Sequence, residues 1–210
     1  MENLEKKIAE SLLQIKAIKL QPANYFTWAS GWKSPIYCDN RKTLSYPEIR
    51  NEIKNTFVKI IEKEYETPDY IAGVATGAIA IGMLVADAMH LPFVYVRPKP
   101  KEHGLGNMIE GQIESGKKVV VIEDLISTGK SSLNAVEALR KAEIEVMGMV
   151  AIFTYGFKIS EDNFKNSDVK LTTLSNYEVL IDLALESGYV KESDLKTLRA
   201  WRNDPENWNK

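Results

Sequence analysis

The fold is decided by the stretch Val119-Val120-Val121-Ile122-Glu123-Asp124-Leu125-Ile126-Ser127-Thr128-Gly129-Lys130-Ser131-Ser132. The β-branched run from Lys118 to Ile122 predicts a buried strand, a small-residue turn follows at Ser127 to Ser132, and a helix is predicted from Leu133 to Ala142. A strand, a turn and a helix in this order form the repeating unit of α/β proteins. In such proteins ligands bind beyond the carboxyl ends of the strands, which is where we expect Glu123 and Asp124.

Strands and helices alternate on both sides of this stretch. The pattern predicts strands at Tyr70 to Ala75, Pro92 to Arg97, Glu145 to Phe153 and Val169 to Leu174, and a helix at Ile79 to His90. Most of these strands are unbroken apolar runs, which is typical of parallel strands covered by helices on both faces. We therefore predict an α/β fold with a central, mostly parallel sheet flanked by helices, in a single domain spanning residues 1–210.

The two ends of the chain do not continue the alternation. Apolar residues recur at helical spacing between Leu4 and Ile15, and the aromatic-rich segment from Gln21 to Asn40 predicts a hairpin. Two Ser-x-x-Glu pairs predict capping boxes at the start of two further helices: Ser45 with Glu48, and Ser175 with Glu178. We expect residues 1 to about 45, with part of the C-terminal tail, to form a small hood over the sheet.

Composition and charge exclude several classes of protein. Lys and Arg number 27 and Asp and Glu number 29, so the formal net charge of −2 argues against a general nucleic-acid binder. The single Cys38 rules out an internal disulfide and a thiolate metal cage, and it fits a reducing compartment. The charged N-terminal segment is not a signal peptide, and the run from Tyr70 to Leu84 is too short to cross a bilayer. We expect a soluble cytoplasmic protein.

The turn after the two acids has the features of an anion site. Small residues place backbone N–H groups and hydroxyls at the start of a helix, which suits a phosphate monoester. Glu123 and Asp124 repel a phosphate, so they need sugar hydroxyls or a hydrated Mg²⁺ in between. Together these features indicate a phosphorylated sugar, although each alone also fits an ordinary strand, turn and helix with solvated acids. The spacing of a P-loop is absent.

Three stretches of the chain resemble one enzyme family. Val119 to Ser132 resembles the phosphoribosyl pyrophosphate (PRPP) signature of the type I phosphoribosyltransferases. Arg97 to Asn107 resembles the mobile catalytic loop of the orotate phosphoribosyltransferases within that family, and Phe26 to Tyr37 resembles their N-terminal hood. The three stretches occur in the family's order, and the resemblance covers nearly the whole chain.

The resemblance implies the type I phosphoribosyltransferase fold and a defined reaction. Members transfer the 5-phosphoribosyl group from PRPP to orotate, giving orotidine 5′-monophosphate and pyrophosphate in pyrimidine (UMP) biosynthesis. The resemblance also implies Mg²⁺, bound through PRPP and waters near Glu123 and Asp124, and a homodimer in which the mobile loop reaches the partner's site. Orotate and PRPP are then the small-molecule partners, with no nucleic acid and no membrane.

The roles of individual residues follow from the same resemblance. Lys101, His103 and Asp124 match the catalytic positions. The implied PRPP ligands come from the basic loop, from a loop after an earlier strand and from the signature itself: Arg97, Lys99, Lys101, His103, Thr76, Gly77, Glu123, Asp124, Leu125, Ile126, Ser127, Thr128, Gly129, Lys130 and Ser131. The implied orotate ligands are Ser127, Lys33 and Tyr37.

The sequence departs from one branch of the family at three positions. That branch has a Lys where this chain has Ala29, a Lys at Gly77 and an Arg near Gly156. The group that holds the orotate carboxylate therefore stays open between Lys33, the Ser127 hydroxyl and backbone amides.

Two other functions are weighed against an orotate enzyme. A phosphoribosyltransferase for a purine base would keep the acids and the turn, but the hood stretch around Trp28 and Lys33 argues against it. A PRPP-sensing regulator would need a DNA-binding element or a basic surface, and the net charge of −2 argues against that.

Overall fold

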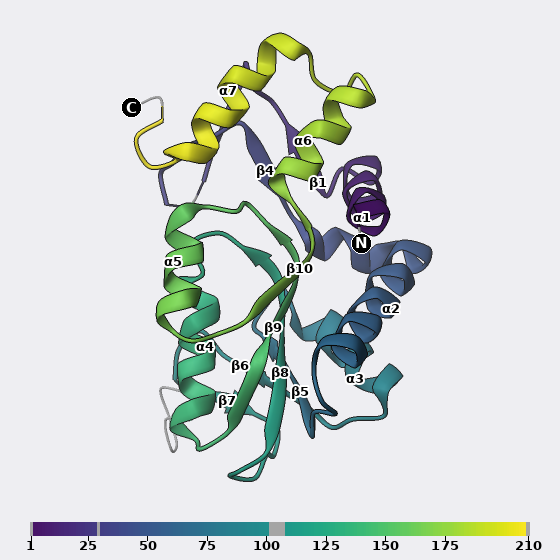
Figure 1. Cartoon of the computed structure of the whole chain (residues 1–210), viewed down its shortest axis with the longest axis vertical. Helices are drawn as coiled ribbons and strands as arrows, with labels where there is room; N and C mark the ends of the chain where they lie inside the picture. Colours follow the sequence, from purple (N-terminus) through teal and green to yellow (C-terminus); the bar gives the residue numbers. More distant parts are fainter. Residues whose placement is uncertain (1, 29, 101–107, 209–210) are drawn as a thin grey trace.

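The computed structural model describes residues 2–28, 30–100 and 108–208. Within these residues a six-stranded sheet has the order β10-β9-β8-β5-β6-β7. Its strands are β5 (Tyr70–Val74), β6 (Phe93–Val96), β7 (Ile109–Glu110), β8 (Lys118–Ile126), β9 (Glu145–Thr154) and β10 (Leu171–Asn176). Neighbouring strands pair in parallel, except that β6 and β7 are antiparallel. The predicted α/β fold with a mostly parallel sheet is confirmed (Figure 1).

Helices cover both faces of the sheet. Successive residues of β8 point to opposite faces, so each face has its own apolar core. Val120 and Ile122 pack in one apolar core with α1 (Glu2–Gln14), α2 (Pro47–Glu64) and α3 (Ile79–Met89). Val119 and Val121 pack in a second core with α4 (Lys130–Lys141) and α5 (Lys158–Asn166). Figure 1 shows the two groups of helices on either side of the sheet. Among the helices of the described residues, none combines the length and the apolar character that crossing a bilayer requires.

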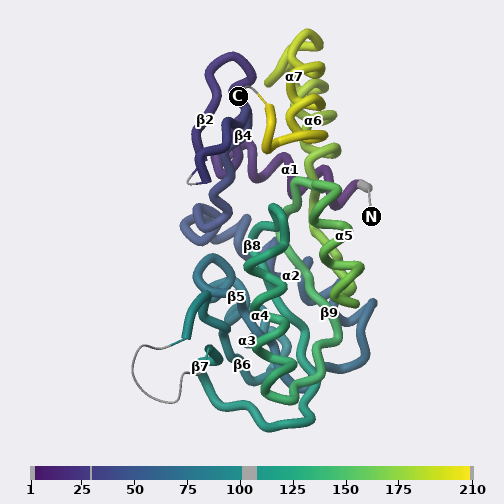
Figure 2. Tube along the Cα trace, turned by 90° about the vertical axis from the view of Figure 1, so that its left-hand side faces the viewer, coloured from purple at the N-terminus to yellow at the C-terminus, as the bar shows by residue number. Residues whose placement is uncertain are grey.

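A second group of elements lies at the carboxyl end of the sheet. β1 (Ile18–Leu20) pairs antiparallel with β4 (Ile36–Cys38), and β2 (Phe26–Thr27) with β3 (Lys33–Ser34). Two helices from the other end of the chain, α6 (Tyr177–Glu186) and α7 (Glu192–Asn203), lie beside these strands (Figure 2). We call β1–β4, α6 and α7 the hood. The predicted hood also included α1, but the structure packs that helix in the apolar core with α2 and α3. A 3₁₀ helix, η1 (Asn40–Ser45), connects β4 to α2.

Trp201 of α7 ties the C-terminal part of the hood to its strands. The side chain is fully buried, and its Nε1 donates a hydrogen bond to the carbonyl oxygen of Lys33 at 3.2 Å. Its ring centroid lies 5.2–5.6 Å from four other rings, a separation at which aromatic pairs attract each other, and these belong to Trp28, Tyr155, Phe157 and Tyr177. Trp201 is therefore a packing anchor between α7 and the hood strands.

The central strand is longer than predicted. β8 does not end at Ile122 but continues through both acids, because Glu123 and Leu125 pair with Ala151 and Phe153 of β9. Helix α4 also begins earlier, at Lys130, so the turn contains only residues 127–129. The prediction that the acids lie beyond the strand was therefore wrong: they are part of β8, in the section that pairs with β9 after the pairing with β5 has ended at Ile122.

Neither predicted capping box forms. Ser45 is the last residue of η1, so Tyr46 precedes α2 and no side chain caps that helix. Ser175 is buried within β10, and the next residue caps α6 instead: the Asn176 side chain accepts a hydrogen bond from the N–H of Val179 at 3.1 Å. β7 and α5 were not predicted, because a two-residue strand and a short, mostly polar helix carry little apolar periodicity.

Candidate active site

The loop that follows β5 meets the last residues of β8 at the carboxyl edge of the sheet. Gly77, in the loop after β5, packs against the carboxylate of Asp124 in β8: a Cβ built on Gly77 would overlap Oδ2 and Cγ of Asp124 and would lie 2.6 Å from its Oδ1. Only a residue without a side chain leaves the carboxylate where it is. The structure thus brings the predicted Thr76–Gly77 loop to Asp124, the acid expected to hold the sugar hydroxyls, which we call the ribose acid.

Glu123 is held by the protein itself. Its Oε1 accepts a hydrogen bond from the N–H of Asp124 at 2.9 Å, and its Oε2 accepts one from the Ser132 hydroxyl at 2.8 Å. Only 4% of the residue is exposed. Burial raises the pKa of Glu123 well above its usual range, and the neighbouring Asp124 carboxylate adds to this rise. Glu123 therefore braces the end of β8 against the first turn of α4.

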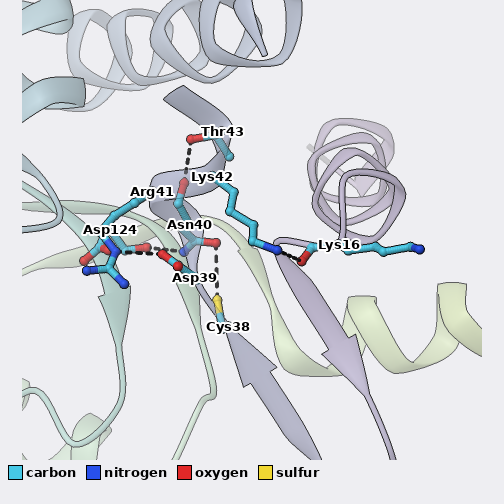
Figure 3. A network of polar contacts seen from close by, with 8 residues as sticks. All are labelled: Lys16, Cys38, Asp39, Asn40, Arg41, Lys42, Thr43 and Asp124. Carbon is cyan, nitrogen blue, oxygen red and sulfur yellow. Dashed lines mark hydrogen bonds and ion pairs between the residues drawn. The ribbon is translucent and has the colours of Figure 1, made fainter. Parts of the chain in front are cut away.

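Asp124 is half-buried and faces the edge of the sheet. Burial raises the pKa of its carboxyl group, while the hydrogen bond with Glu123 and the charge of Arg41 act in the opposite direction. Its carbonyl oxygen accepts a hydrogen bond from Nδ2 of the buried Asn40 at 2.6 Å (Figure 3). The main chain of Asp124 is thus fixed from η1, and its carboxylate stays partly exposed.

The turn at residues 127–129 leads into α4 through Gly129. This residue has a positive φ of +77°, and a Cβ on it would lie 2.7 Å from the Phe164 ring, so both backbone and packing favour glycine. No side chain caps α4, which leaves its first N–H groups for an anion. The Asn163 side chain donates to the carbonyl oxygen of Thr128 at 3.0 Å and holds the turn in place.

A cavity of about 290 Å³ lies between the hood and the end of β8. Its lining is largely aromatic and apolar, with a few hydroxyl groups, and comprises Thr27, Trp28, Tyr37, Cys38, Leu125, Ser127 and Tyr155. This size and lining suit one small planar heterocycle. A larger hollow of about 700 Å³, which Gln14 and Ile49 help to line, lies apart from every predicted site residue. The smaller cavity contains two of the three predicted orotate ligands, Tyr37 and Ser127, and is therefore the candidate base site.

The structure brings together only part of the predicted orotate site. Tyr37 and Ser127 both line the cavity. Lys33 is absent from the lining: its Nζ donates to Oγ1 of Thr27 across the β2–β3 hairpin at 3.0 Å, and the side chain is exposed.

The other predicted PRPP ligands are spread along the sheet edge. Ile126 has its side chain fully buried in the core, so only its main chain can face a ligand, while Lys130 and Ser131 are exposed at the start of α4. Arg97 directly follows β6 and forms an ion pair with Glu110 at 3.5 Å, and Lys99 is exposed. Lys101 and His103, both predicted to be catalytic, lie outside the described residues.

Known proteins that resemble this chain share both its sequence and its fold. The model of the phosphoribosyl transferase domain matches residues 43–187. An orotate phosphoribosyltransferase of Bacteroides thetaiotaomicron is 62% identical over 208 residues, with 99% of this chain and 98% of the relative covered. The chain belongs to the orotate phosphoribosyltransferases.

Solved structures place the fold in the same group. A UMP synthase of Leishmania donovani has a TM-score of 0.80 at 26% identity, and the match covers 96% of this chain but only 42% of that longer one. An orotate phosphoribosyltransferase of Aeropyrum pernix has a TM-score of 0.76 at 23% identity, covering 88% of this chain and 99% of the other. The predicted type I phosphoribosyltransferase fold is confirmed.

Three residues that border the site were not predicted from the sequence. Asn40 and Arg41 reach Asp124 from η1. Arg202 of α7 lies over Gly156, where a Cβ would be 3.1 Å from its Nη2, and the same guanidinium pairs with Glu178 at 3.1 Å. The Arg202 guanidinium thus lies beside Gly156. By the family resemblance, an Arg near this position is expected only in another branch of the family. The sequence carries one signal for Asn40 and Arg41: polar residues follow the residues of β4, as the two acids follow the apolar run at residues 118–122.

Proposed function

We propose that this chain, as a single domain spanning residues 1–210, transfers the 5-phosphoribosyl group from PRPP to N1 of orotate and releases pyrophosphate. The observation that carries the proposal is the position of Ser127, which belongs both to the wall of the base cavity and to the turn that opens α4. A base in the cavity and a phosphate in the turn would be joined by a ribose beside Asp124. The 62% identity to an orotate phosphoribosyltransferase over 208 residues supports the same substrates.

Each part of PRPP has a proposed place in this arrangement. The 5′-phosphate accepts hydrogen bonds from the N–H groups at the start of α4, where the helix dipole also favours an anion. The ribose hydroxyls donate to Asp124, while Glu123 keeps the strand end in position. The Thr76–Gly77 loop offers its backbone amides to the diphosphate group. Because the reaction needs no protein nucleophile, positioning and electrostatic stabilisation of the leaving group provide the catalysis.

The donor set also fits the Mg²⁺ that the family resemblance implies. No group of three or more His, Cys, Asp and Glu side chains converges within the described residues, and Mg²⁺ commonly keeps waters and substrate phosphates as its main ligands. Asp124 offers a hard carboxylate oxygen beside the proposed diphosphate position. When bound there, the ion would neutralise part of the negative charge of PRPP.

An absorbance assay tests the reaction. Orotate is mixed with PRPP and Mg²⁺, and the loss of the orotate band is followed, with adenine, hypoxanthine and uracil run in parallel. We expect consumption of orotate alone. The Asp124→Asn variant should be about 10- to 100-fold slower, since it keeps the shape of the side chain and removes the charge that accepts the ribose hydroxyls. Turnover of a purine with orotate untouched would refute the proposed substrate.

We also propose a homodimer in which Lys101 and His103 act on the pyrophosphate in the partner's site. Mixing Lys101→Ala with Asp124→Asn tests this. In a hybrid dimer one site then carries both changes and the other carries neither, so activity should return to about a quarter of wild type if half the dimers are hybrids. If each loop serves its own subunit, no activity returns. A monomer by sedimentation would refute the shared site while leaving the reaction itself untouched.

A further inference from the structure

The guanidinium of Arg41 stands beside the ribose acid without binding it. Its Nε pairs with Oδ1 of Asp39 at 2.7 Å, and its charge acts on Asp124, yet Arg41 and Asp124 form no ion pair. Figure 3 shows the guanidinium next to Asp124. The Arg41 side chain is 58% exposed, so a ligand can reach it. A cationic and an anionic side chain that lie side by side without forming an ion pair suit a ligand with both hydroxyls and phosphates, since the anion accepts from hydroxyls and the cation binds phosphates.

The main chain around Arg41 is fixed by the residues on either side. Asn40 is buried and binds the carbonyl oxygen of Asp124 through Nδ2, and its own carbonyl oxygen accepts a hydrogen bond from the Thr43 hydroxyl at 2.6 Å. The N–H of Asp39 donates to the carbonyl oxygen of Ala17 at 2.8 Å. Arg41 therefore projects from a rigid segment that is itself attached to the strand carrying the ribose acid.

The neighbouring loop supplies no positive side chain. Thr76, Gly77 and Ala78 are uncharged, and Asp124 blocks any side chain at position 77 in the observed arrangement. Arg97 is already paired with Glu110. Asp39 engages Arg41 through Nε, so the two terminal nitrogens of the guanidinium remain suited to a bidentate contact with phosphate oxygens.

We propose that Arg41 binds the diphosphate group of PRPP, from the same subunit as Asp124. This rests on the proposed function, because it is the ribose on Asp124 that brings the diphosphate to Arg41. Arg41 is absent from the lining of the base cavity, so orotate is not its ligand. The diphosphate is thereby held from the hood side of the sheet as well as by the Thr76–Gly77 amides.

Binding of inorganic pyrophosphate with Mg²⁺, measured by calorimetry, tests the assignment. Arg41→Gln should weaken pyrophosphate binding and raise the KM for PRPP by about 10- to 100-fold, and leave the KM for orotate within about twofold, since hydrogen bonds to charged groups contribute in this range. Arg41→Lys should recover part of the loss. Lys42→Gln is the matched control: it removes the same charge one residue away, but Lys42 points to the carbonyl oxygen of Lys16, so binding should stay as in wild type (Figure 3).

A structural role for Arg41 gives different results. Asp39→Asn weakens the ion pair with Arg41 but keeps the guanidinium. The affinity of this variant for pyrophosphate should therefore stay within a few-fold of the wild-type affinity. Wild-type pyrophosphate binding in Arg41→Gln would overturn the proposal, as would an equal loss for orotate and PRPP, or an equal loss in Asp39→Asn. If the wild-type protein itself neither binds PRPP nor consumes orotate, the proposed function fails first.

Discussion

Replacing Gly77 with Ala tests whether the ribose acid depends on the loop beside it. The new Cβ would lie 2.6 Å from Oδ1 of Asp124 and closer still to its other carboxylate atoms. Ordinary contacts are about 3.5 Å, so the carboxylate must move by more than about 1 Å. A displacement of that size at a reacting centre can cost about 100-fold in rate. We therefore expect kcat/KM to fall about 100-fold, or about 2.7 kcal/mol in barrier.

A double-mutant cycle separates this displacement from other effects of the substitution. In an Asp124→Ala background there is no carboxylate for the new methyl group to displace, so Gly77→Ala should cost less than about twofold there. Initial rates of orotate consumption for the four proteins give the coupling directly. Equal losses in both backgrounds would refute the reasoning, because the methyl group would then act through the backbone of the loop and not through Asp124.

Three further substitutions test other parts of the site. Thr128→Ala should raise the KM for PRPP by about 5- to 10-fold and lower kcat less, because the 5′-phosphate does not change charge in the reaction; an unchanged KM in initial-rate assays would contradict this. The melting temperature of Glu123→Gln, relative to that of wild type, should rise as the pH is raised from about 5 to 8 without PRPP or Mg²⁺. The pKa of Glu123 is raised in the folded protein, so higher pH destabilises wild type, whereas Gln does not ionise. A difference in melting temperature that stays constant with pH would argue against this. Trp201→Ala should lower the free energy of unfolding by about 3–5 kcal/mol in urea titrations; a loss under about 1 kcal/mol would mean that the ring cluster contributes little.

Local patterns predicted the sheet because the β-branched run at residues 118–122 and the alternation around it are short-range signals. They did not predict where β8 ends, since the pairing of Glu123 and Leu125 with β9 involves residues well over twenty positions away. Ser45 and Ser175 have the local spacing of capping boxes, but Ser45 belongs to the 3₁₀ helix η1 and Ser175 to strand β10, so neither can cap the next helix. Whether a Ser-x-x-Glu pair caps a helix therefore depends on the neighbouring element and not on the motif alone.

The candidate site was predictable where a motif carried it and unpredictable where only the fold did. Asp124 and the turn at residues 127–129 stand together in the sequence, so their spacing could be recognised. Asn40 is 84 positions from Asp124, and its contact exists only because η1 packs against the end of β8. Arg202 likewise reaches Gly156 only because α7 packs beside the strands of the hood. Contacts between elements, rather than spacing within one, determine these neighbours.

Because Trp201 of α7 packs on two residues that line the base cavity, the cavity wall is complete only after the C-terminal part of the chain has been synthesised. Gly77, Asp124 and the turn at residues 127–129 are synthesised well before α7, and nascent chains generally fold from the N-terminus as they emerge. Trp28 and Tyr155 line the cavity and pack on each other, but they gain their contacts with Trp201 only once α7 is made. A nascent chain halted ahead of α7 would hold a formed sheet edge beneath an uncovered aromatic surface, which is the kind of apolar exposure that chaperones bind during translation.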